Sequence, residues 1–363
     1  MLHQPATGEA SASTREKADS FGSQLALFGM DTSWSGYGDV TFAMVPEEHE
    51  ASFEALRFNP ILGFHLSEWL SGEMEIEFEH SGFEIVLEYA MLDFTPIKGS
   101  RAVVLRCGKF LAPFGKFNEQ FHPTFRWAQA SRPLMFDDVV PVTWSEVGVQ
   151  VRGFIARGSV AFEYAAGVVN GLAERADAGG DEAGAMEPGV AARPGFVREL
   201  RDNVVDNNFD KAVVGRAAVT IGRGGPVTAT IGLSGYSGKI DDAGAERLSI
   251  ADIDAEVKAG ALSLDSEVAQ VFLGRRGDYA DRFSRGSYLQ LMYTLGRWTA
   301  AGRWDYARQG PRAGPLTTYQ AAVATIRFAP AIDWSVRLEL DVPFRPEGSA
   351  DKTAILAMLS FAF

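Results

Sequence analysis

The stretch WSVRLELDV, residues 334–342, decides the fold because its apolar and polar residues alternate without a break. One face carries Trp, Val, Leu, Leu and Val, whereas the other carries Ser, Arg, Glu and Asp. A period of two predicts a β-strand with one apolar and one polar face. The same alternation recurs in ADIDAEVK (251–258) and MEIEFE (74–79). A soluble sheet with one wet face would explain any one of these segments, so the number of strands and their connections must decide.

Counting such segments from residue 36 to the end gives about sixteen predicted strands, an even number. We expect them near 36–45, 52–66, 70–79, 83–94, 101–110, 143–155, 158–171, 210–222, 226–238, 248–259, 262–274, 284–296, 298–309, 317–329, 333–345 and 352–363. Every second connection is short, as in TPIKGS (95–100) and GRGGP (222–226), and most of the others are longer and polar. Sorting of this kind is typical of outer-membrane barrels, whose tight turns lie on the periplasmic side.

The expected fold class is therefore all-β: a transmembrane antiparallel β-barrel of about sixteen strands, with short periplasmic turns and long extracellular loops. The barrel must close, because lipid offers no hydrogen-bond partner to an open sheet edge. The run AILAMLSFAF (354–363) fits a closing strand whose outward positions end on the aromatic Phe363. A terminal aromatic after such a run resembles the recognition signal of bacterial outer-membrane barrels.

Composition excludes several other classes. The chain has 363 residues, 46% hydrophobic and 22% charged, with a formal net charge of −13, so it is neither a disordered chain nor a basic nucleic-acid binder. A single cysteine, Cys107, excludes an internal disulfide framework. The sequence contains no run of eighteen uncharged apolar residues, which a transmembrane helix would need. A membrane-spanning strand needs only about 9–11 residues.

Two units are expected along the chain. Residues 1–24 lack the charged start and apolar core of a secretory signal, so we expect a polar, flexible N-terminal tail with no signal peptide in this chain. Residues 25–363 would form the barrel. Its segment 172–209 is polar and rich in Gly and Ala, which favours a long extracellular loop.

A wall of sixteen strands encloses an aqueous channel rather than a filled core. Inward positions carry charges that a dry core could not hold, and the carboxylates include Glu75, Glu77, Glu88, Asp252, Asp254, Glu256, Asp265 and Glu267. The residues we expect to line the lumen are Arg106, Arg152, Arg216, Arg303, Asp305, Arg327, Arg337 and Glu339. Carboxylates outnumber bases among the inward positions, which favours cations.

Segment 111–142 holds too many aromatic residues to extend into solvent, so it should pack against other parts of the chain. Folding into the barrel would make it a constriction loop, and the expected constriction residues are Lys116, His122, Arg126, Arg132, Asp137 and Asp138. The alternative is an external cap that buries its own Phe cluster.

Several motifs follow one another in an order that resembles the phosphate-selective porin family of Gram-negative outer-membrane channels. They are GKFLAPFG (108–115), SRPLMF (131–136), VGVQVRG (147–153), YAAGVVNG (164–171), the pair Gly215-Arg216 and GLSGYSG (232–238). The resemblance implies a sixteen-strand barrel, often trimeric, whose inward third loop and basic residues attract anions such as phosphate. One departure is Ser145-Glu146, where such porins usually carry an Arg.

Enzyme chemistry has no support in the sequence. The five histidines show no metal-ligand spacing, and GLSGYSG lacks the glycine spacing of a nucleophile elbow. We therefore expect no metal, no cofactor and no catalytic residues, but a passive porin for small hydrophilic solutes or ions in the outer membrane of a Gram-negative bacterium. Its expected partners are lipid, these solutes and two further copies in a homotrimer, with no nucleic acid. The alternative is a non-conducting receptor or structural barrel that binds a partner through its long loops.

Overall fold

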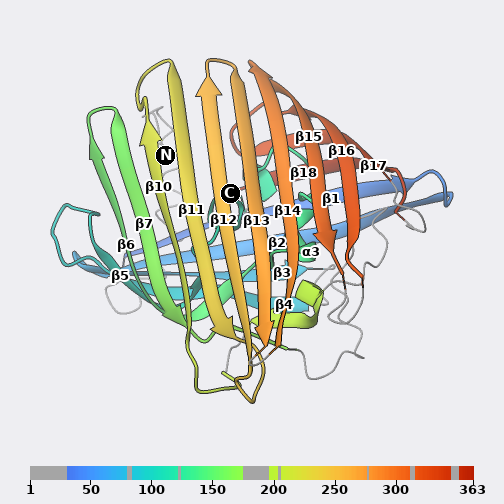
Figure 1. The fold of residues 1–363 in the computed structure, drawn as a ribbon. Helices are drawn as coiled ribbons and strands as arrows, with labels where there is room; N and C mark the ends of the chain where they lie inside the picture. The colour runs from blue at the N-terminus through green and yellow to red at the C-terminus, as the bar shows by residue number, and fades with distance from the viewer. Residues whose placement is uncertain are drawn as a thin grey trace.

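The computed structural model describes residues 31–79, 84–121, 124–174, 196–202, 206–275, 278–310, 315–344 and 351–363. Sixteen strands form one closed antiparallel barrel (Figure 1), which confirms the predicted fold class. They are β1 (Asp31–Val45), β2 (Glu50–Ser67), β3 (Leu70–Glu79), β4 (Glu84–Phe94), β5 (Val104–Leu111), β6 (Ser145–Arg157), β7 (Val160–Val169), β10 (Ala212–Ile221), β11 (Val227–Lys239), β12 (Glu246–Ala259), β13 (Leu262–Arg275), β14 (Asp278–Leu295), β15 (Trp298–Gln309), β16 (Thr317–Phe328), β17 (Trp334–Phe344) and β18 (Ala354–Ala362).

Six shorter elements lie in the two long connections. They are α2 (Phe117–Gln120), η2 (Thr124–Arg126), α3 (Met135–Asp138), β8 (Leu172–Glu174), η3 (Phe196–Glu199) and β9 (Leu200–Asp202). Strands β8 and β9 pair with each other in a separate two-stranded sheet. Among the described helices none is long and apolar enough to cross a membrane.

The barrel closes where its first and last strands meet. Strand β1 pairs with β18 in a register that runs from Tyr37 opposite Ala362 to Met44 opposite Ile355. At the end of this ladder, Gly36 and Phe363 exchange two backbone hydrogen bonds of 2.9 and 3.0 Å. The Phe363 ring stacks on Phe58 with centroids 5.5 Å apart.

The two faces of the strands separate as the alternation predicts. On β17, the side chains of Arg337 and Glu339 are 0% and 1% exposed, whereas the neighbouring Leu338 is 58% exposed. On β13 and β14, Leu264, Val268, Leu289 and Leu291 likewise lie exposed on the outer face. An outer wall of this kind suits acyl chains, because a charge there would cost about 2–4 kcal/mol near the midplane.

Bulges interrupt the alternation on one side of the barrel. The β1–β2 register shifts between Val40 and Thr41, and the β3–β4 register shifts between Glu75 and Ile76. The second shift leaves Glu88 as an extra residue on β4, and both Glu88 and Tyr89 become buried. A bulge re-aims side chains in this way because two residues then oppose one.

Part of the barrel interior is an apolar core rather than a wet lumen. Buried aromatic residues from the β5–β6 connection, including Phe117, Trp127 and Phe136, pack with Leu248 and Tyr288 from the inner wall. Leu172, Phe196 and Leu200 from the β7–β10 connection belong to the same cluster. The charged inner positions therefore share the interior with a dry region.

The connections also differ in part from expectation. The loop between β1 and β2 lies at the end of the barrel where long loops are expected, but it spans only residues 46–49. The predicted tail, residues 1–24, lies outside the described residues, as do 175–195 and 203–205 of the predicted loop 172–209.

Candidate pore constriction

The connection between β5 and β6, residues 112–144, crosses the inside of the barrel; in Figure 1 it lies behind the front strands, with α3 near β14. Its first part docks on β11 and β13: Gly115 N donates to Ser234 Oγ at 3.0 Å, and Phe117 N donates to Glu267 Oε2 at 3.3 Å. Gly115 has a φ of +61°, and a Cβ there would lie 1.9 Å from Glu267 Oε1. Only glycine permits this close approach.

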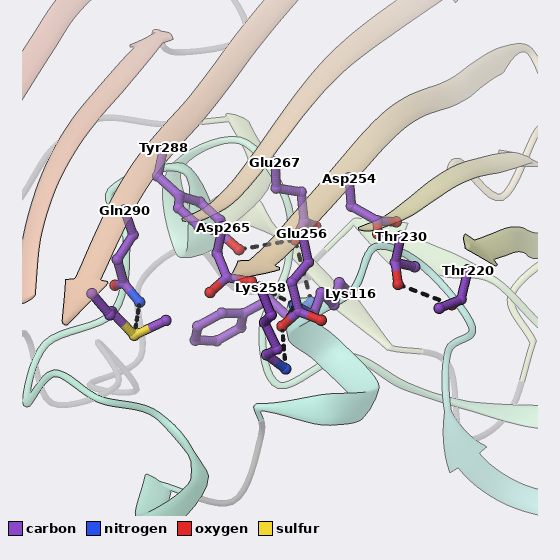
Figure 2. A network of polar contacts seen from close by, with 12 residues as sticks. Lys116, Thr220, Thr230, Asp254, Glu256, Lys258, Asp265, Glu267, Tyr288 and Gln290 are labelled. Carbon is purple, nitrogen blue, oxygen red and sulfur yellow. Dashed lines mark hydrogen bonds and ion pairs between the residues drawn. The ribbon is translucent and has the colours of Figure 1, made fainter. Parts of the chain in front are cut away.

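Lys116 fixes the base of this segment (Figure 2). Its ammonium group lies 2.6 Å from Glu256 Oε1 on β12 and 2.5 Å from Asp265 Oδ1 on β13. The same nitrogen lies 4.9 Å from the centroid of the Phe121 ring. Lys116 is 4% exposed, so these are charge-assisted contacts in a poorly hydrated place.

Arginines on three successive strands hold the middle of the segment. Arg303 on β15 donates to Ser131 O, Ser131 Oγ and Arg132 O at 2.9–3.0 Å and contacts Gln129. Arg327 on β16 donates to Phe125 O at 3.3 Å, and Arg337 on β17 donates to Trp127 O at 2.9 Å. These guanidinium groups donate hydrogen bonds to backbone carbonyls of the segment inside the barrel.

Glu339 completes this side from β17. Its two carboxylate oxygens accept the backbone N–H groups of Ala130 and Ser131, each at 2.8 Å. Aromatic packing adds to the polar contacts, since Phe117 stacks on Phe136 at 4.3 Å and Trp127 meets Tyr288 edge-on at 5.9 Å. The segment is thereby attached along the wall from β11 to β17.

The opposite wall carries ion pairs that reach solvent. Arg106 on β5 binds both oxygens of Asp93 on β4 at 2.6 and 2.7 Å, and Arg57 on β2 lies 2.9 Å from Glu77 on β3. The side chains of Arg106 and Arg57 are 11% and 15% exposed. Because the outer face of these strands is apolar, this exposure faces the inside of the barrel.

Arg152 on β6 joins the two sides. It lies 3.0 Å from Glu119 of α2, and its side chain is 25% exposed. The partly hydrated charges therefore mark a gap between segment 112–144 and the wall β2–β6. The buried charges on β12–β17, in contrast, are covered by the segment.

A second group of carboxylates lies on the β1–β4 wall. Glu75 accepts hydrogen bonds from Tyr37 Oη at 2.6 Å and Asn59 Nδ2 at 2.7 Å. Glu73 accepts one from Tyr89 Oη at 2.9 Å. Hydroxyl and amide groups thus supply the hydrogen bonds described here for both carboxylates.

The predicted constriction residues have different surroundings. Arg126 is exposed on η2 with its guanidinium 5.6 Å from the Phe125 ring, and Arg132 is half-buried. Asp138 is buried on α3. His122 and the side chain of Asp137 lie outside the described residues.

The predicted lumen-lining residues divide into two classes. Arg106 and Arg152 face the gap, whereas Arg216, which binds both oxygens of Asp254 at 2.7 and 2.8 Å, is buried. The other buried residues are those that hold the segment or pair beside it: Arg303, Asp305, Arg327, Arg337 and Glu339. The sequence analysis did not identify Arg57 as an inward-facing residue. The bulge in β2 shifts the alternation of inward and outward positions, so simple counting along the strand fails there.

Metal chemistry finds no support in the geometry. Within the described ranges, no group of three or more His, Cys, Asp or Glu side chains is arranged to hold a metal ion. The arrangement offers charged side chains beside a gap, which can attract, repel and pass ions.

Comparison with known proteins adds the following. No known family profile matches the chain. An uncharacterized protein of Aquifex aeolicus is 31% identical over 150 residues, which are 39% of this chain and 32% of that protein. The chain thus spans about a third of the length of this relative.

Solved structures share the fold. The anion-selective porin of Comamonas acidovorans has a TM-score of 0.59 at 10% identity and covers 92% of this chain and 100% of its own. The outer-membrane channel DcaP of Acinetobacter baumannii gives a TM-score of 0.57 at 12% identity, covering 93% of this chain and 98% of its own. The trimer form of OmpT, an outer-membrane protein of Vibrio cholerae, gives 0.56 at 10% identity, covering 92% and 99%. The chain therefore has the fold of outer-membrane porins and channels.

Proposed function

We propose that this chain is a passive porin of a Gram-negative outer membrane, and that small hydrophilic solutes and ions pass between segment 112–144 and the wall β2–β6. The observation that carries the proposal is the row of partly hydrated ion pairs inside the barrel, opposite the buried side of the segment. Partly exposed charges inside a barrel whose outer face is apolar support a water-filled passage. No catalytic step or cofactor is part of this function.

Planar-bilayer recording tests the proposal. Purified protein in its folded, heat-modifiable form is expected to give discrete conductance steps in potassium chloride. The same protein boiled before addition is the control and should give none. Absence of steps from the folded protein would refute the channel.

We propose further that the passage prefers cations. Arg57, Arg106 and Arg152 already face Glu77, Asp93 and Glu119 at 2.6–3.0 Å, so these three arginines have little uncompensated positive charge to attract an anion. Glu73, in contrast, accepts its hydrogen bond from the neutral hydroxyl group of Tyr89. The phosphate preference that the sequence resemblance implies would instead need uncompensated bases beside the gap.

The reversal potential in a potassium chloride gradient measures this preference. A cation-preferring passage gives a reversal potential with the sign of the potassium equilibrium potential, and the opposite sign would support the anion preference. Glu73→Gln should move the value toward zero. Lys98→Gln is the control, because Lys98 lies in an exposed turn with its side chain 82% exposed.

A homotrimer is the proposed assembly, supported by the trimer form of the similarly folded OmpT. Mass determination in detergent, with the detergent contribution subtracted, tests it. Three times 39.3 kDa is the expected protein mass, and a single copy would contradict it.

The apolar cluster inside the barrel favours a second candidate, a non-conducting receptor or structural barrel. Leu172, Phe196 and Leu200 from the β7–β10 connection pack there beside the constriction segment and fill part of the interior. In this case the long loops would bind a partner and the bilayer recordings would stay silent.

A further inference from the structure

Two arginines lie directly opposite each other on the outer face of the barrel. The register pairs Arg285 on β14 with Arg308 on β15, two strands that run side by side in Figure 1. Their sequence neighbours Ser284, Ala307 and Gln309 are buried. Arg285, in contrast, is exposed and Arg308 is partly exposed. Successive side chains of a strand point to opposite faces, so both arginines point away from the barrel interior.

The pair lies at one edge of the apolar outer wall. Farther along the same face, Leu289 and Leu291 on β14 and Trp304 on β15 are all exposed. Arg308 is one residue from the end of β15, at the end of the barrel that carries the β5–β6 connection. Outer-membrane barrels turn their long connections to the outside of the cell. In an outer membrane the arginines therefore lie at the level of the outer-leaflet headgroups, and the leucines face the acyl chains.

The two guanidinium groups are short of negative charge. Arg285 Nε donates to the hydroxyl group of Tyr306 at 3.2 Å, and the guanidinium carbon lies 5.5 Å from the centroid of that ring. Both contacts are with a neutral side chain. Across the part of the chain that the structure describes, neither Arg285 nor Arg308 forms an ion pair. Like charges directly opposite each other on neighbouring strands are destabilising, so this arrangement calls for an anion.

A third outward arginine at the same end of the barrel has its counter-charge within the chain. Arg247 is exposed on β12, and its guanidinium group lies 2.8 Å from a carboxylate oxygen of Asp210. Position on the outer face therefore does not by itself leave an arginine uncompensated. The pair on β14 and β15 differs from Arg247 in this respect.

The side chains beside the pair are hydrogen-bond donors as well. Gln270 on β13 lies directly opposite Arg285, and Thr318 on β16 lies directly opposite Arg308. Amide, guanidinium and hydroxyl groups thus follow one another across four neighbouring strands. A phosphate group offers several acceptor oxygens and binds a planar guanidinium group through two parallel hydrogen bonds. The row therefore matches a phosphate group in both charge and hydrogen bonding.

We propose that Arg285 and Arg308 bind a phosphate group of a phosphorylated glycolipid in the outer leaflet, whose acyl chains lie along Leu289, Leu291 and Trp304. The apolar wall beside the arginines favours a lipid over free phosphate, which has no chains to place there. This inference goes beyond the proposed channel, because it needs the barrel in its membrane and not a conducting lumen.

Native mass spectrometry of the folded full chain in detergent tests the site by counting bound lipid. The probe is lipid A with two phosphate groups, which the unaltered protein is expected to bind. Fully dephosphorylated lipid A, and the probe with the double variant Arg285→Gln, Arg308→Gln, should each bind about tenfold more weakly or less, because the charge-assisted hydrogen bonds are lost. Arg247→Gln is the matched control and should bind as the unaltered protein does, since Arg247 already has Asp210 as its partner.

The site is refuted if the unaltered protein does not bind the probe, or if the double variant or the dephosphorylated lipid binds equally well. Displacement of the probe by an equal concentration of inorganic phosphate would also overturn the lipid as the ligand. If the double variant does not reach the heat-modifiable folded form, Arg308→Gln alone replaces it and should also bind more weakly. Lipid binding by protein that gives no bilayer steps would contradict the channel and support this site, whereas steps without lipid binding would contradict this site alone.

Discussion

Lys116 attaches the base of segment 112–144 to the inner wall of the barrel. It brings a positive charge from the segment to the β12–β13 wall, and both carboxylates that it meets are largely buried. Lys258 meets the same Glu256 at 2.8 Å, but its own side chain is 54% exposed. The two lysines therefore allow a buried ion pair and an exposed ion pair to the same carboxylate to be compared.

Replacing Lys116 by Met should release the base of the segment. Breaking a buried pair by removing one partner costs about 3–5 kcal/mol, whereas an exposed pair contributes about 0–1 kcal/mol. Hydrogen exchange of the amides of 115–121 should accelerate by at least about a hundredfold in Lys116→Met. Lys258→Met is the control with little change, and equal acceleration in both variants would contradict this role of Lys116.

Gly286 on β14 permits the close packing of α3. A Cβ at this position would lie 2.4 Å from Met135 Cβ and 3.1 Å from Met135 Cα. Gly286→Ala should therefore destabilise the protein by about 1–3 kcal/mol through overpacking. Gly302→Ala on β15, where nothing lies within 4 Å, should be close to neutral. Denaturant midpoints in detergent compare the two variants, and a neutral Gly286→Ala would refute the contact.

Among the elements, the strands β15, β16 and β17 differ in how firmly each holds the segment. Arg303 makes three contacts at 2.9–3.0 Å with Ser131 and Arg132, whereas Arg327 makes one at 3.3 Å with Phe125 O. Arg303 also lies 2.9 Å from Asp305, with both side chains fully buried. The β15 anchor should therefore hold the segment more firmly than the β16 anchor.

Arg303→Gln should detach the middle of the segment and leave Asp305 unpaired, at a cost of about 3–5 kcal/mol. A detached segment obstructs the gap less steadily, so single-channel records should show a larger and noisier conductance. Arg327→Gln is the weaker counterpart and should alter the conductance much less. The reverse order of the two variants would contradict the assignment of β15 as the stronger of these two anchors.

The elements also show where sequence reasoning succeeds and where it stops. Alternation in 334–342 and 354–363 predicts β17 and β18, because lipid and water demand opposite faces. Arg57 and the burial of Tyr89 beside Glu88 escaped prediction, because a bulge changes the phase without a sequence signal. The aromatic content of 111–142 predicts that it packs, but its anchors on β15–β17 lie about 170–210 residues away in the sequence. Pairings so distant follow from barrel closure and not from local pattern.

The whole molecule separates three environments: an apolar outer surface, an apolar cluster in part of the interior, and partly exposed ion pairs along the β2–β6 wall. Two stacked soluble sheets would have buried the apolar faces, whereas Leu289, Leu291 and Leu338 are 51–58% exposed. This separation is the premise of the proposed channel. Because of this separation, adjacent residues of one strand face the apolar outer surface and the barrel interior in turn.

Arg106 and Cys107 test that separation most directly, because they are adjacent on β5 and point to opposite faces. Protein in lipid vesicles is treated with a charged, membrane-impermeant thiol reagent, using the native Cys107 and the double variant Arg106→Cys, Cys107→Ser. The cysteine at position 106 should react rapidly from the water of the passage, while Cys107 should stay unmodified until the vesicles are dissolved and the protein is unfolded. Rapid labelling of Cys107 in intact vesicles, with none at position 106, would contradict a barrel with lipid outside and water within.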